Sequence, residues 1–200
     1  MSHESLKNKT IKGTVWSAAD AFLGQGISLL VGIVLGRLLS PDEYGLIGIC
    51  LIFNSILNGV VDSGFGSALI RKEDADDRDY NTMFYTNLVV SIFLYLLLYA
   101  SSFYIGVFFH RPEVSSLIKV TGLVLIFNSF SFVQGTILSK KLDFKAKTKA
   151  SVISSVLSGV LGITSAYVGL GVWSLVIQVV SRSFFNSLCC IVNSSRKHFI

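Results

Sequence analysis

The stretch that decides the fold runs from Ala150 to Ser195: ASVISSVLSGVLGITSAYVGLGVWSLVIQVVSRSFFNSLCCIVNSS. Its 46 residues carry a single formal charge, Arg182. As one helix it would be about 69 Å long, more than twice the roughly 30 Å of a bilayer's hydrocarbon core. It must therefore fold back once, and Gly169-Leu170-Gly171 supplies the break because glycine adopts turn conformations without steric cost. The stretch predicts two membrane-spanning helices joined by a short turn.

The rest of the chain repeats this pattern of long apolar runs between clusters of charge. Of its 200 residues, 52% are hydrophobic and 14% are charged. A soluble domain carries about 25% charged residues, so an ordinary soluble domain is excluded. The runs predict an all-α integral membrane protein, one unit over residues 1–200, whose six transmembrane helices cover residues 14–39, 45–63, 82–109, 114–138, 150–168 and 172–192.

Positive charge is distributed unequally between the two sides of these spans. Of 17 Lys and Arg residues, Lys119 and Arg182 lie inside spans, and Arg37 and Arg111 lie on one side. The others lie on the opposite side: Lys7, Lys9, Lys12, Arg71, Lys72, Arg78, Lys140, Lys141, Lys145, Lys147, Lys149, Arg196 and Lys197. Because positively charged loops resist translocation, we expect this side and both termini to be cytoplasmic. These separate segments explain the net charge of +5 without a nucleic-acid partner.

Polar side chains recur at helical spacing within the spans, so that each set lies along one helix face. Arg182 is the strongest indication of function among them. An ionised group at the bilayer centre costs about 3 kcal/mol on insertion scales, and Arg does not lose its proton. It needs a buried carboxylate, a water-filled cavity or an anionic ligand such as a phosphate. The candidate substrate-binding residues are Arg182, Gln178, Asn186, Asn54, Asn58 and Lys119.

Two acidic residues, Asp20 and Asp62, are candidates for ion coupling because they lie at a similar depth in the first two spans. They could carry protons or sodium, pair with Arg182, or cap a helix. The neutral polar residues also have an alternative interpretation, as hydrogen-bonding seams between packed helices. Lys119, two turns from the outer end of its span, could instead extend its amine to the membrane surface.

Small residues form two further lines that we interpret as packing faces. Small side chains let helix backbones approach closely in a membrane. The two lines are Gly24, Ser28, Gly32 and Gly36 in the first span, and Ser154, Ser158, Gly162 and Ala166 in the fifth.

Enzymatic features are absent from the sequence. Its three histidines, His3, His110 and His198, lie in loops or near the termini, and no nucleotide-binding glycine motif is present. The three cysteines have no paired spacing, which argues against a disulfide framework or a zinc site. We therefore expect no catalytic residue, no cofactor and no metal.

Five motifs resemble a known family when they are taken together. They are LKNKTIKGTVWS (6–17), GRLLSPDEYG (36–45), DSGFGSALIR (62–71), LDFK (142–145) and GLGVWSL (169–175). In this order and at this spacing the chain resembles the polysaccharide transporter family, the Wzx-type lipopolysaccharide, O-antigen and exopolysaccharide flippases of the multidrug/oligosaccharidyl-lipid/polysaccharide (MOP) flippase superfamily. The resemblance covers essentially the whole chain.

The resemblance implies a multi-pass protein of the bacterial inner membrane that has no ATP site. Such a protein moves an undecaprenyl-diphosphate-linked oligosaccharide across the membrane by ion-coupled alternating access, for lipopolysaccharide or exopolysaccharide biosynthesis. Arg182 falls where a cavity cation would suit a diphosphate. Membrane lipids and the lipid-linked oligosaccharide are the expected partners.

Family members have two six-helix lobes around a central cationic cavity, so this chain resembles the N-terminal lobe only. The second lobe would come from a missing C-terminal half, a second copy or another chain. Two alternatives stay open, a multidrug or small-solute exporter of the same superfamily and a non-transporting membrane assembly partner. An exporter of cationic compounds would favour acidic cavity residues, which Arg182 and Lys119 are not.

Overall fold

The computed structural model describes residues 3–61, 77–140 and 144–195, and these segments are helical apart from short turns. The helices are α1 (His3–Leu38), α2 (Pro41–Val61), α4 (Asp77–Phe108), α5 (Pro112–Thr121), α6 (Leu123–Lys140), α7 (Phe144–Tyr167) and α8 (Val172–Ser195). Within the described residues, six stretches are long and apolar enough to cross a membrane: Ala21–Leu38, Pro41–Val61, Asn81–Phe108, Pro112–Thr136, Lys147–Tyr167 and Val172–Val192. The prediction of an all-α membrane protein with six transmembrane helices is confirmed.

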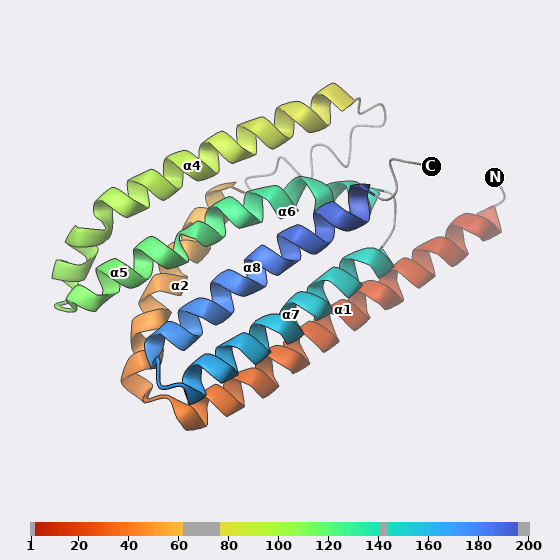
Figure 1. The fold of residues 1–200 in the computed structure, drawn as a ribbon. Coiled ribbons are helices and arrows are strands. Elements are labelled where there is room, and N and C mark those ends of the chain that lie inside the picture. Colours follow the sequence, from red (N-terminus) through yellow and green to blue (C-terminus); the bar gives the residue numbers. More distant parts are fainter. Residues whose placement is uncertain (1–2, 62–76, 141–143, 196–200) are drawn as a thin grey trace.

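The helices lie side by side in one bundle (Figure 1). Helix α1 packs along α7 at one edge, α7 packs against α8, and α8 packs against α6. At the other edge α4 runs along α5 and α6, and α2 contacts α4, α5, α6 and α8. The α1–α2, α4–α5 and α7–α8 turns lie toward the same end of the bundle, at the lower left of Figure 1, and we call it the turn end.

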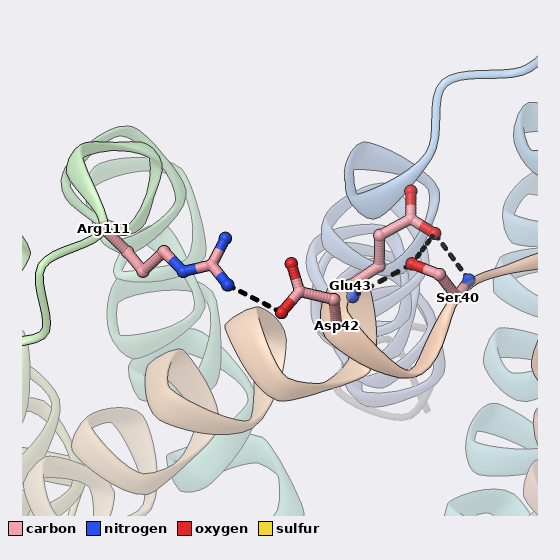
Figure 2. A network of polar contacts seen from close by, with 4 residues as sticks. All are labelled: Ser40, Asp42, Glu43 and Arg111. Carbon is pink, nitrogen blue, oxygen red and sulfur yellow. Dashed lines mark hydrogen bonds and ion pairs between the residues drawn. The ribbon is translucent and has the colours of Figure 1, made fainter.

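Helix α2 begins four residues before the predicted Gly45, because a capping box stabilises its first turn. The Ser40 backbone N–H donates to Glu43 Oε2 at 2.7 Å, and the Ser40 hydroxyl donates to the same oxygen at 3.0 Å. The Glu43 N–H donates in turn to Ser40 Oγ at 3.4 Å (Figure 2). Pro41, in the first helical position, has no N–H that would need an intrahelical partner. Asp42 and Glu43 thus lie inside the helix, whereas the predicted span began after them.

The start of α2 also contacts the α4–α5 turn and the α7–α8 turn. Arg111, in the α4–α5 turn, forms an ion pair of 2.8 Å with Asp42 (Figure 2). Gly171, in the α7–α8 turn, has a φ of +54° and lies so close to Glu43 Oε1 that a Cβ on it would overlap this atom. Gly169 has a φ of +87°, so the predicted break between the last two spans is a turn that relies on glycine.

The predicted fourth span, residues 114–138, consists of two helical segments rather than one. Helices α5 and α6 meet at Gly122, where α4 approaches closely. A Cβ on Gly122 would lie 3.0 Å from both Tyr95 Cδ2 and the Ile118 carbonyl oxygen. The Gly122 N–H still donates to that carbonyl at 2.8 Å, so the two segments run on in nearly the same direction. Charge spacing alone gives no sign of this interruption.

The apolar core fills the part of the bundle nearest the turn end. It is built from the end of α1, the start of α2, most of α5 and the starts of α6 and α8, together with one residue of α4, Leu98. Its fully buried members include Leu35, Cys50, Leu117, Ile118 and Leu125. Outside the core, large apolar side chains are exposed on five of the six membrane-spanning stretches, for example Phe22, Phe103 and Tyr104 at 81%, 65% and 75%. Among the described side chains of the sixth stretch, Pro112–Thr136, none is exposed in this way. A soluble surface would not carry so many, whereas a surface that faces lipid tails does.

Candidate functional site

A polar pocket lies between α6, α7 and α8, beyond the apolar core. Its volume is about 200 Å³. Six residues line it, one from α6, two from α7 and three from α8: Asn128, Ser151, Ser154, Arg182, Ser183 and Asn186. Arg182 and Asn186 belong to the predicted candidate set and are one turn apart on α8. Because all six side chains are polar, the pocket differs sharply from the lipid-facing surface of the same helices.

Arg182 contributes the charge of this pocket. It lies near the middle of α8, its side chain is exposed, and its Nη1 donates a hydrogen bond of 2.9 Å to Ser28 Oγ on α1. Among the side chains that the structure describes, no carboxylate lies within ion-pair distance of Arg182. The ion pair that these side chains do form joins Arg111 and Asp42, at the turn end of the bundle. A neutral hydroxyl satisfies one of the five guanidinium N–H groups and leaves the charge uncompensated.

A series of asparagines connects the pocket wall to α2. Asn128 donates to Asn58 Oδ1 at 2.9 Å, Asn58 donates to the Asn54 carbonyl at 2.7 Å, and Asn54 donates to the Cys50 carbonyl at 3.1 Å. Asn54 and Asn58 therefore support the pocket from behind rather than line it. Asn186 donates to Ser131 Oγ on α6 over 3.5 Å. These bonds hold α2, α6 and α8 together through amide groups, as the seam interpretation of the neutral residues requires.

Two of the predicted candidates lie away from the pocket. Gln178 packs against α7 at Gly162, where a Cβ on the glycine would lie 2.9 Å from Gln178 Cβ. Lys119 lies on the side of the bundle formed by α4 and α5, with its Nζ 5.1 Å from the centre of the Tyr99 ring. Neither residue lines the pocket that contains Arg182, although Gln178 lies one turn before Arg182 on the same helix.

The ion-coupling candidates fall at the margins of the description. Asp20 lies in α1, eight residues before Ser28, but its side chain is outside the described part of the chain. Asp62 follows the last residue of α2, Val61, and also lies outside the described residues. No three His, Cys, Asp or Glu side chains among the described residues could hold a metal ion together.

Sequence reasoning missed the serines of the site. Ser28 and Ser154 were assigned to packing lines, and Ser151 and Ser183 were not singled out. The structure places Ser28 against Arg182 and the other three around the pocket. The packing interpretation holds for part of these lines, because a Cβ on Gly24 would lie 3.9 Å from Ser151 Oγ and one on Gly162 would lie 2.9 Å from Gln178 Cβ, whereas a Cβ on Gly32 would meet no described atom outside the helix's own backbone within 4 Å. The same small residues here both pack against a neighbouring helix and line the pocket. A line of small residues in the sequence does not distinguish these two roles.

Comparison with known proteins connects this arrangement to a function. A family model described as polysaccharide biosynthesis protein matches residues 34–199. The chain belongs to this family. The six apolar helices and this membership make it a multi-pass membrane protein, of the inner membrane in bacteria.

Curated proteins from several bacteria are similar to this chain. Teichuronic acid biosynthesis protein TuaB of Bacillus subtilis is 27% identical over 77% of this chain and 32% of its own length. Succinoglycan biosynthesis transport protein ExoT of Rhizobium meliloti is 25% identical over 88% and 36%. Lipopolysaccharide biosynthesis protein WzxC of Escherichia coli is 25% identical over 92% and 36%. The chain thus spans about a third of the length of these relatives, and no solved structure matches it.

Proposed function

We propose that this chain forms the part of a polysaccharide flippase that binds the diphosphate of an undecaprenyl-diphosphate-linked oligosaccharide while the lipid crosses the inner membrane. Arg182 carries the proposal, as a permanent charge in the middle of a membrane-spanning helix that faces a polar pocket. Such a charge is costly unless an anion compensates it. The flat fork of the guanidinium group matches the oxygens of a phosphate and binds them with two parallel hydrogen bonds.

The lining of the pocket supports an anionic ligand. Beside Arg182 it presents the hydroxyl groups of Ser151, Ser154 and Ser183 and the amide groups of Asn128 and Asn186. Hydroxyl and amide groups donate to phosphate oxygens and also bond to sugar hydroxyls. None of the six lining residues is acidic. A pocket built for a cationic drug would present a carboxylate, so this lining favours the flippase over a multidrug exporter.

Three further parts of the proposal concern the complete transporter. We propose that a second lobe closes the cavity, which agrees with the greater length of the relatives. We propose that both termini are cytoplasmic, as the distribution of Lys and Arg predicts. We propose that Asp20 and Asp62 couple the cycle to protons or sodium, since carboxylates inside membrane spans commonly serve ion pathways.

The test measures lipid-linked oligosaccharide in the inner leaflet of a strain that lacks the gene for this chain. The strain is complemented with the wild type, with Arg182→Ala, or with Arg182→Lys, each in the context of the longest reading frame that restores transport. Under the proposal, Arg182→Ala restores little transport because the diphosphate loses its counter-charge. Arg182→Lys restores part of it, because Lys keeps the charge without the bidentate geometry. Lys119→Ala is the matched control, since it removes an intramembrane cation outside the pocket.

The outcomes separate the competing functions. Accumulation that the wild type relieves and Arg182→Ala does not relieve supports the flippase. Equal relief by the wild type and Arg182→Ala refutes the assignment of Arg182 to the substrate. If deletion causes no accumulation at all, the flippase proposal fails, and the assembly-partner alternative becomes the better explanation.

A further inference from the structure

Arg182 on α8 and its hydrogen-bond partner Ser28 on α1 belong to two helices that both pack against α7 (Figure 1). The Arg182 side chain donates this hydrogen bond to Ser28 Oγ. We propose that Ser28 is a positioning residue, which holds the Arg182 guanidinium at the pocket in the orientation that receives the diphosphate. This inference rests on the function proposed above, and it assigns to Ser28 a role in substrate affinity.

The backbone on either side of Ser28 packs against α7. Four residues before it, Gly24 is buried, and a Cβ on it would lie 3.9 Å from Ser151 Oγ, at van der Waals distance. Three residues after it, Val31 packs against Gly159 so closely that a Cβ on the glycine would lie 2.6 Å from Val31 Cγ2. Residues at this spacing share one helix face. Ser28 therefore lies on the face of α1 that packs against α7, and this packing positions its hydroxyl relative to the long and flexible Arg182 side chain.

The chemistry of a serine suits this role better than that of a carboxylate. A carboxylate in place of Ser28 would neutralise Arg182 and compete with an incoming anion. The Ser28 hydroxyl accepts one hydrogen bond and leaves the charge and four guanidinium N–H groups available. An unrestrained Arg side chain loses its rotamer freedom when a ligand binds, at a cost of about 0.5–1.5 kcal/mol. A hydrogen bond that orients it beforehand removes part of this cost, so loss of the hydroxyl should weaken binding about two- to tenfold.

The experiment measures binding of undecaprenyl diphosphate without sugar to the purified chain in nanodiscs, by native mass spectrometry. Undecaprenol serves as the probe without an anion. The variants are Ser28→Ala, Ser28→Thr and Arg182→Ala, together with Ser28→Ala in an Arg182→Lys background. Ser165→Ala is the matched control, because the Ser165 hydroxyl donates to the Leu161 carbonyl of its own helix at 2.6 Å, away from the pocket. The thermal unfolding midpoint of every variant is measured in parallel.

The expected result is a two- to tenfold weaker affinity for Ser28→Ala, near-normal affinity for Ser28→Thr and Ser165→Ala, and unchanged binding of undecaprenol. In the Arg182→Lys background there is no guanidinium group for Ser28 to orient, so Ser28→Ala should change affinity by less than about twofold. Unchanged affinity of Ser28→Ala, or an equal loss in both backgrounds, would overturn the positioning role. If Arg182→Ala itself binds the diphosphate normally, the proposed function fails first, so the two failures are distinguishable.

Discussion

Helices α1 and α7 are in tight contact at Gly159, and this contact permits a test of the packing that positions Ser28. A Cβ on Gly159 would lie 2.6 Å from Val31 Cγ2 and 3.7 Å from Val31 Cγ1. Carbon atoms that are not bonded to each other settle at about 3.5–4.0 Å. Val31 cannot easily rotate away, because a β-branched side chain in a helix has one strongly preferred rotamer. In Gly159→Ala, helix α1 must therefore shift by about 1 Å.

The size of the effect follows from two opposing contributions. Overpacking of a tight interface costs about 1–3 kcal/mol of the free energy of unfolding. Replacement of glycine by alanine inside a helix returns up to about 1 kcal/mol. The control Gly26→Ala, on the partner helix α1, gains the same helix propensity without a steric clash, since no described atom outside the helix's own backbone lies within 4 Å of its Cβ position. Gly159→Ala should thus be less stable than Gly26→Ala by about 1–3 kcal/mol, or about 2–10 °C in unfolding midpoint.

The assay is thermal unfolding of the purified chain in detergent, combined with the diphosphate-binding measurement. A shift of about 1 Å in α1 would lengthen the 2.9 Å bond between Ser28 and Arg182 beyond hydrogen-bond distance, so binding should weaken as well. In a Val31→Ala background the overlapping methyl groups are gone, and Gly159→Ala should no longer destabilise. Equal stability of Gly159→Ala and Gly26→Ala, or failure of Val31→Ala to suppress the effect, would refute this account of the α1–α7 seam.

Two further predictions concern the turn end. The Arg111–Asp42 ion pair is exposed, with side chains 47% and 64% accessible. Asp42→Asn should therefore lower the free energy of unfolding by no more than about 1 kcal/mol. Because salt screens exposed charges, unfolding measured at low and high salt should show that most of this loss disappears at high salt. A salt-independent loss would contradict this reasoning. Ser40→Ala removes the capping box with Glu43 and should lower the free energy of unfolding by about 0.5–2 kcal/mol, whereas Ser40→Thr, which keeps the hydroxyl, should stay close to the wild type. Equal stability of the two Ser40 variants would show that α2 does not depend on its cap.

The course of the chain through the membrane is predictable from the sequence because it depends on local quantities. A bilayer sets the length of each apolar run, and the apolar run from Ala150 to Ser195, whose single charge is Arg182, is too long for one crossing. The glycines at its centre adopt positive φ values where the break was expected. The apolar run does not reveal the start of α2, because Ser40 and Glu43 form a helix cap there and the acidic residues Asp42 and Glu43 lie within the first turn of the helix.

The candidate site was only partly predictable. The charge of Arg182 stands out in any apolar run, and Asn186 follows from the four-residue spacing of its helix. Gln178 and Lys119 satisfied the same sequence criteria, yet one packs against Gly162 and the other lies over Tyr99. Sequence spacing defines a face on each helix but does not say which neighbour that face meets.

The sequence by itself determined the number of spans, the glycine turn between the last two and the presence of one charge in the middle of the last helix. These follow from hydrophobic length, glycine conformation and the cost of burying a charge, which act on a few residues at a time. Only the tertiary structure decided that Ser28 on α1 holds Arg182 on α8, 154 residues further along the chain, and that serines of α7 complete the pocket. Those neighbours depend on the order and the rotation of packed helices, which side-chain contacts throughout the bundle determine together.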